Sequence, residues 1–203
     1  KAALEVAAGA AYAGARALVT CKQVGLNVAS DPLMSLAYIG VKGGMVVLGA
    51  DDPGPISSHT EQDTLTFGRF SKIPVFDPSS VKEAYRIMRE AFALSEREHT
   101  PVIVRPTTRI DHGYEAIEVS DEDEWETREI EGFVKDSSKW VIFPRLSVAN
   151  HAKIEERNDR LASEFSHAPY DAYNYVSGQA YVRADGKRVG LATGGINFAY
   201  TVD

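Results

Sequence analysis

Residues 45–63, "MVVLGADDPGPISSHTEQD", join an apolar run directly to a polar one. The first six residues, Met45 to Ala50, are almost all apolar, which is typical of a short strand buried on both faces of a parallel sheet. The acids, prolines and glycine that follow favour a turn. Ser58 and Glu61 have the spacing of a capping box, so a helix is expected to begin there and run past Phe70. The stretch therefore predicts a strand, a turn and a helix in succession.

The residues before this stretch favour helices. Residues 1–18 are rich in alanine and place apolar side chains at helical spacing. Ser30, Asp31 and Pro32 resemble a helix start, because a capping side chain precedes a proline whose missing N–H is harmless there. That helix is expected to end near Gly40. The helical spacing in the first segment rests on five residues: Leu4, Ala8, Ala11, Ala15 and Leu18.

The residues after this stretch repeat the alternation of strand and helix. A short strand is predicted at Ile73–Phe76, and a second capping box at Ser80–Glu83 opens a helix that reaches about Glu98. Pro101–Arg105 is a third short apolar strand. Strands that alternate with helices predict an α/β fold, a parallel sheet with helices on both faces.

Changes of amino-acid composition along the chain divide it into three parts. Residues 1–112 form the main domain, with its N-terminus expected to be missing. Residues 113–187 are a linker with an acidic stretch (115–131) and an isolated charged helix (150–166). Residues 188–203 contain the apolar segment "VGLAT" followed by two glycines, and are expected to start a second α/β domain.

Composition excludes several classes of protein. The net charge of −7 argues against a nucleic-acid partner, whose phosphates need an excess of Lys and Arg. No apolar run approaches the roughly 20 residues of a membrane span. The single cysteine, Cys21, excludes an internal disulfide and any four-cysteine metal site, and a cytoplasmic setting is expected. The histidines lack the spacing of metal ligands, so no protein metal site is predicted.

Three loops at predicted strand ends are candidates for a binding site, because ligands of open parallel sheets lie beyond the carboxyl ends of the strands. After Ala50, a helix N-terminus with Ser57 and Ser58 offers donors to a carboxylate or phosphate. The alternative is that this segment is only a turn with a helix cap, and the residues alone leave the two readings equal.

The other two strand ends are less distinctive. The loop from Thr20 to Asn27 contains Lys22, interpreted as a solvated charge, and Cys21, interpreted as a small buried residue rather than a nucleophile. After the 101–105 strand, Arg105 and Arg109 either clamp an anion or pair with the acidic linker.

The order of these segments is similar to that in a known family. "ALEVAAGAAYAGARALVTCKQVGLNVASDPLMSLAYIGVKGGMVV", "ADDPGPISSHTEQD" and "PVIVRPTTR" closely resemble the α subunits of indolepyruvate:ferredoxin oxidoreductases, which are thiamine-diphosphate-dependent 2-oxoacid:ferredoxin oxidoreductases. The resemblance covers residues 1–109 and continues more loosely through "GFVKDSSKWVIFP" to "RVGLATGGINFAY". It implies that residues 1–112 are most of a pyrimidine-binding domain and that residues 188–203 enter a transketolase C-terminal-like domain.

The resemblance also implies a site. Its cofactor-binding residues would be Gln23, Gly25 and Asn27, and the substrate side would carry Ser57, Ser58 and Gln62. The catalytic glutamate of the family is expected immediately before Lys1, so residues 1–203 alone are expected to be inactive. Thiamine diphosphate with Mg would be held mostly by another domain, and the iron–sulfur clusters would lie elsewhere in the protein.

The implied reaction is the oxidative decarboxylation of an aryl 2-oxoacid to an acyl-coenzyme A, with ferredoxin as electron acceptor and a second subunit in an oligomeric enzyme. Pyruvate or 2-oxoglutarate is the alternative substrate. A further alternative is a module for subunit association without catalysis.

Overall fold

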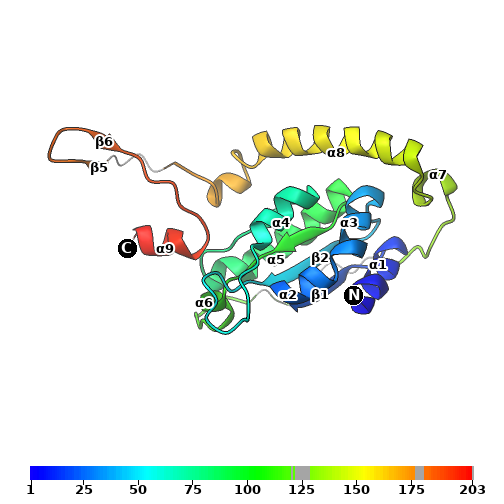
Figure 1. Cartoon of the computed structure of the whole chain (residues 1–203), viewed down its shortest axis with the longest axis horizontal. Coiled ribbons are helices and arrows are strands. Elements are labelled where there is room, and N and C mark those ends of the chain that lie inside the picture. Colours follow the sequence, from blue (N-terminus) through cyan, green and yellow to red (C-terminus); the bar gives the residue numbers. More distant parts are fainter. Residues whose placement is uncertain (120, 122–128, 177–180, 203) are drawn as a thin grey trace.

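The fold is built on a parallel sheet of four strands, as the computed structural model shows for residues 1–119, 121, 129–176 and 181–202. The spatial order is β1 (Ala17–Lys22), β2 (Met45–Ala50), β4 (Val102–Val104) and β3 (Val75–Phe76), and every neighbouring pair is parallel (Figure 1). The predicted α/β class and the three predicted strands are confirmed.

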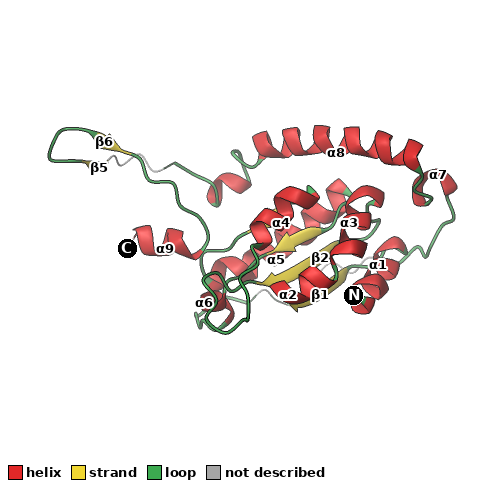
Figure 2. Cartoon of the chain, in the orientation of Figure 1, coloured by secondary structure: helices red, strands yellow, loops and turns green. Residues whose placement is uncertain are grey.

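Helices cover the sheet on both faces (Figure 2). The connections β1→β2 and β2→β3 advance in one direction across the sheet, whereas β3→β4 returns. Because such crossovers are right-handed, the helix of the returning connection must lie on the opposite face. The helices of this part of the chain are α1 (Ala2–Tyr12), α2 (Gln23–Val28), α3 (Ser30–Ile39), α4 (Thr64–Ser71), α5 (Val81–Glu98) and α6 (Thr108–Asp111).

Alternation along the strands divides the core accordingly. Val47 and Ile103 pack with α1 and α3 on one face, while their neighbours Val46 and Val104 pack with α5 on the other. All four side chains are at most 1% exposed. Burial on both faces explains why these strands are unbroken apolar runs, as the sequence led us to expect.

Three details of the first helices differ from the predictions. The alanine-rich helix ends at Tyr12, and Leu18 belongs to strand β1. The residues after β1, predicted as a loop, form the short helix α2. Helix α3 begins at Ser30 as expected, without a side-chain cap. Alanine spacing alone does not decide where a helix ends, because small side chains fit many environments.

The charged helix of the linker is longer than predicted and is not isolated. Helix α8 runs from Pro144 to Glu164, after the short helix α7 (Ser137–Trp140). It contacts the C-terminal ends of the helices that precede the strands: Asn150 Nδ2 donates to Tyr38 O in α3 at 2.9 Å, and Arg157 Nη2 donates to Lys72 O after α4 at 2.7 Å. Donors at these ends pair with carbonyls that lack partners within the helix.

The chain then continues beside edge strand β3. The ring of Tyr170, in a 3-10 turn at Tyr170–Ala172, lies 6.2 Å from that of Phe76, and Phe165 joins the same core cluster. Residues 144–173 therefore form a strap. Its helix rests on α3, on the residue after α4 and on the end of α5, and its last residues approach Phe76 of β3.

The last described residues contain a hairpin and a helix. Strands β5 (Tyr181–Val182) and β6 (Arg188–Val189) pair antiparallel, and helix α9 spans Ile196–Val202. The segment expected to open a second domain thus contributes only two residues to a strand here, and Leu191 within it is exposed. Among the described residues, none of the helices has the length and apolar character needed to cross a membrane.

Candidate functional site

Three charged residues meet at the carboxyl ends of three strands. Asp51 follows β2, Asp77 follows β3 and Arg105 follows β4. Arg105 Nε lies 2.7 Å from Asp51 Oδ2, and Arg105 Nη1 lies 3.1 Å from Asp77 Oδ1. The Asp51 side chain is 1% exposed and that of Arg105 is 10% exposed, so this pairing is largely shielded from water.

Burial and charge act in opposite directions on this cluster. Burial raises the pKa of Asp77, although the Arg105 guanidinium lowers it in part. Burial also acts to lower the pKa of Arg105, but the hydrogen bonds and charges of the two aspartates outweigh it, and the pKa is raised. Neither predicted role of Arg105, anion clamp or partner of the acidic linker, describes these contacts, because its partners are the strand-end aspartates. Arg109 donates to Tyr200 Oη at 2.8 Å.

A polar cavity of about 340 Å³ opens beside this cluster. Besides the three charged residues it contains Gln62, one of the predicted substrate-side residues, and two residues of the C-terminal segment, Gly194 and Asn197. A larger cavity of about 700 Å³ continues from Asp77 along β3 and the strap. The remaining lining of the smaller cavity is Pro53, Glu61, Asp63 and Leu65.

The loop of residues 53–63 is organised differently from the prediction. Helix α4 begins at Thr64, and its cap is Asp63, whose side chain accepts from Leu65 N. The predicted capping box of Ser58 and Glu61 is therefore wrong. The amides of Ser57 and Ser58 donate to Asp52 Oδ2, at 2.9 and 2.8 Å. The backbone donors that the sequence offered to an anionic ligand are thus used by an aspartate of the same loop.

The Asp52 carboxylate is held ionised by these contacts. Hydrogen bonds, first from Ser57 N and then from Ser58 N and Thr108, outweigh burial and place the pKa of Asp52 well below its usual range. A depressed pKa means that the carboxylate stabilises the fold at every pH above its unfolded value of about 3.9, and that this contribution is lost as the pH falls toward the folded value.

We therefore expect the side-chain ¹³C resonance of Asp52 to stay unchanged when the pH is lowered from 7 to about 3.5, since the carboxyl remains ionised. NMR titration measures this directly, with the urea-unfolded chain as the reference for an ordinary aspartate. A titration midpoint for Asp52 near the ordinary value of about 3.9 would contradict the hydrogen-bonded arrangement.

The predicted cofactor-binding residues lie on α2, directly after β1. Gln23 is 2% exposed, and its Nε2 has no hydrogen-bond partner among the described residues. Gly25 approaches Cys21, since a Cβ at Gly25 would lie 3.0 Å from the Cys21 Cβ. Asn27 is exposed. Cys21 is half-buried, and burial raises the pKa of its thiol, which fits a packing residue better than a nucleophile.

The two predicted sets come together at the same edge of the sheet. Lys22, the last residue of β1, is in register with Ala50, the last residue of β2. Gln23 therefore follows one strand and the 53–63 loop follows its neighbour. A buried amide without a partner is costly, and Gln23 Nε2 is such an atom, just behind this edge of the sheet.

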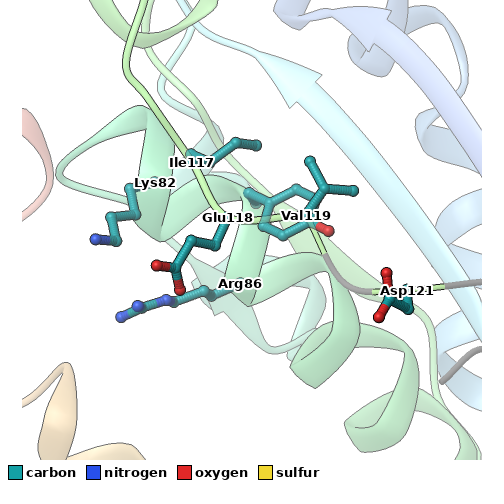
Figure 3. Close-up of a pocket in the computed structure, with 7 residues that line it drawn as sticks. Lys82, Arg86, Ile117, Glu118, Val119 and Asp121 are labelled. Carbon is teal, nitrogen blue, oxygen red and sulfur yellow. The ribbon is translucent and has the colours of Figure 1, made fainter.

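A second surface feature lies away from the predicted residues. Arg86 of α5 lies beside Glu118 from the segment after α6 at a cavity of about 340 Å³, which Lys82 also lines (Figure 3). The side chains are of mixed charge and open to solvent, so this cavity is not a built anion site. Within the described part of the chain, His, Cys, Asp and Glu side chains form no cluster suited to a metal ion.

Sequence reasoning missed the three aspartates at the strand ends. The signal was present, because Asp51 and Asp52 directly follow the β2 run and Asp77 follows β3. Position at a strand end marks a residue as a candidate, but which residue pairs with which depends on the strand order.

Comparison with known proteins shows which family and which relatives the chain resembles. Residues 1–176 match the family described as "Pyruvate flavodoxin/ferredoxin oxidoreductase, thiamine diP-bdg". The chain is 37% identical over 203 residues to "Indolepyruvate oxidoreductase subunit IorA" of Pyrococcus abyssi, covering 98% of this chain and 30% of that protein. It is 37% identical to the protein of the same name from Archaeoglobus fulgidus, covering 99% of this chain and 31% of the relative.

A third relative of the same name, from Methanothermobacter thermautotrophicus, is 44% identical over 163 residues, which are 79% of this chain and 26% of the relative. The chain thus spans less than a third of the length of the relatives it matches. The family match covers most of the chain, including the sheet, the strand-end cluster and the strap. The chain belongs to the thiamine-diphosphate-binding family of the pyruvate flavodoxin/ferredoxin oxidoreductases.

Proposed function

We propose that this chain forms one wall of the thiamine diphosphate site in a 2-oxoacid:ferredoxin oxidoreductase that acts on aryl 2-oxoacids of the indolepyruvate type. The observation that carries the proposal is the buried, unpaired amide of Gln23 at the strand edge that also presents the 53–63 loop. The names of the relatives support the substrate class.

Each set of residues has a separate role in this proposal. Gln23, Gly25 and Asn27 contact the cofactor, and the Gln23 amide donates to one of its polar atoms. When bound, thiamine diphosphate supplies the nucleophilic carbon that decarboxylates a 2-oxoacid. In this proposal, the family's glutamate expected before Lys1 would hold the proton of the aminopyrimidine ring, and Mg would be held mainly by another domain.

The substrate side is assigned to Ser57, Ser58 and Gln62. Their hydroxyl and amide groups can donate to a keto-carboxylate. Gln62 borders the cavity beside the strand-end cluster, whereas Ser57 and Ser58 are not part of its lining. In the proposed enzyme, coenzyme A would accept the acyl group, and iron–sulfur clusters outside residues 1–203 would carry the electrons to ferredoxin. We further propose that the protein assembles with a partner subunit into an oligomeric enzyme in the cytoplasm.

Replacing Gln23 tests its proposed contribution to the binding of thiamine diphosphate. In the full-length protein with its partner subunit, we expect Gln23→Leu to raise the Kd of thiamine diphosphate about tenfold, because one hydrogen bond worth about 1.4 kcal/mol is lost. Isothermal titration calorimetry measures the Kd without turnover. Thr100→Val is the matched control, since Thr100 Oγ1 is also buried and unpaired but precedes β4 at the opposite edge. Equal affinity in the Gln23→Leu and wild-type proteins would contradict the assignment.

The substrate class is tested in the same preparation. The ferredoxin-reducing activity is measured with indolepyruvate, phenylpyruvate, pyruvate and 2-oxoglutarate in the presence of coenzyme A. We expect the highest kcat/KM for the aryl acids. A preference for pyruvate or 2-oxoglutarate would overturn the substrate class, and normal assembly without turnover of any acid would favour the subunit-association module.

A further inference from the structure

Asp52, which directly precedes the 53–63 loop, holds the backbone of that loop through hydrogen bonds. Its Oδ2 accepts hydrogen bonds from three consecutive backbone amides, those of Ile56 at 3.1 Å, Ser57 at 2.9 Å and Ser58 at 2.8 Å. Asp52 is only 4% exposed, whereas Ser57 is exposed and Ser58 is half-buried. A buried carboxylate therefore fixes the backbone of two residues whose side chains remain accessible.

The other carboxylate oxygen ties this loop to the neighbouring strand. Thr108 Oγ1 donates to Asp52 Oδ1 at 2.8 Å. Thr108 is itself fixed, because its backbone N donates to Asp51 O at 2.9 Å, and Asp51 N donates to Pro106 O at 2.9 Å. The position of Ser57 and Ser58 is thus set by the ends of β2 and β4, through one side chain.

We propose that Asp52 is a positioning residue of the enzyme, which acts through the backbone of Ser57 and Ser58 and does not itself touch the substrate. The inference deepens the proposed function and rests on the assignment of that loop to the substrate side. Because Ser57 and Ser58 are assigned to substrate binding, displacing their backbone is expected to weaken binding of the 2-oxoacid and to leave the chemical step unchanged.

Two variants separate the geometry of Asp52 from its charge. Asp52→Ala removes the acceptor of all three amides. Asp52→Asn retains one acceptor oxygen for the amides and can turn its NH₂ toward Thr108 Oγ1, so it is expected to rescue most of the loop. Asp136→Ala is the matched control, because Asp136 accepts from Ser138 N at 2.9 Å in the same way but caps α7, far from α6 and the loop (Figure 1).

The experiment uses the full-length protein with its partner subunit and follows two quantities. In Asp52→Ala we expect the KM for the 2-oxoacid to rise about tenfold with kcat and the Kd of thiamine diphosphate changed less than about twofold, as for a group that binds ground state and transition state alike. Hydrogen exchange should lose protection in the peptide of residues 53–63 and keep it in the peptide of β1. Asp52→Asn should lie within about threefold of the wild-type KM, and Asp136→Ala should match it.

The outcomes separate this inference from the proposed function. If Ser58→Ala and Gln62→Ala raise the KM while Asp52→Ala does not, the positioning role is overturned and the proposed function stands. If Ser58→Ala and Gln62→Ala leave the KM unchanged, the substrate-side assignment fails and the inference fails with it. If Asp52→Ala does not fold, Thr108→Val decides: unchanged exchange in residues 53–63 and an unchanged KM would overturn the inference.

Discussion

Arg105→Met is expected to lower the free energy of unfolding by about 3–5 kcal/mol, because it leaves two aspartate carboxylates without a counter-charge in a shielded position. Asp51 is 1% exposed and Asp77 is 20% exposed. Water can therefore replace the guanidinium only in part. Urea denaturation of wild-type and variant chains at pH 7 measures the difference.

The loss of unfolding free energy in Arg105→Met is expected to depend on pH. Without Arg105 the pKa of Asp77, already raised by burial, rises further. A group whose folded pKa is raised stabilises the fold in its protonated form, so the loss of stability is largest at neutral pH and shrinks as the pH falls toward 5.

Arg160 provides the matched control for Arg105. Its side chain is 53% exposed, and its partner Glu98 keeps a second cation, because Arg97 Nε lies 2.9 Å from Glu98 Oε1. Arg160→Met is therefore expected to cost less than about 1 kcal/mol. If Arg105→Met and Arg160→Met destabilise the chain equally, the strand-end cluster is not the buried network described here.

Gly43→Ala is expected to destabilise the fold by about 3 kcal/mol or more, although the added group is one methyl. A Cβ at Gly43 would lie 2.1 Å from Ala15 O and 2.6 Å from Gly14 C. Both neighbours are backbone atoms, and Gly43 N also donates to Ala11 O at 2.8 Å. The turn before β2 and the end of α1 would have to separate.

Gly9→Ala is the control for this effect. Gly9 lies within α1 and a Cβ there would meet nothing within 4 Å, so alanine should stabilise the chain by about 0.5–1 kcal/mol. Thermal unfolding of both variants would show shifts of opposite sign. A melting temperature of Gly43→Ala equal to that of the wild type would contradict the close approach.

Two capping boxes with the same spacing show what local sequence can predict. Ser80 caps α5 as expected, with Ser80 Oγ accepting from Glu83 N at 3.1 Å. Ser58 and Glu61 do not, because Asp52 takes the Ser58 amide and the helix starts at Thr64 instead. The Ser58 motif failed because a competing acceptor six residues earlier, Asp52, forms a better set of hydrogen bonds.

The strand-end cluster shows the limit of sequence reasoning. The predicted strands are confirmed, whereas the ligand site at their carboxyl ends stays a prediction. The partners of Arg105 are 54 and 28 residues away in sequence, and they meet because β4 lies between β2 and β3. That order follows from the reversal of one connection, which no spacing within the chain encodes.

The strap of residues 144–173 has a consequence for any attempt to isolate the sheet domain. A chain ended at residue 112 would keep all four strands but would uncover Phe76, a large apolar side chain on the edge strand β3. Apolar edge strands recruit one another, so such a truncation invites aggregation. The smallest piece worth expressing therefore reaches beyond Tyr173, the last residue of the strap.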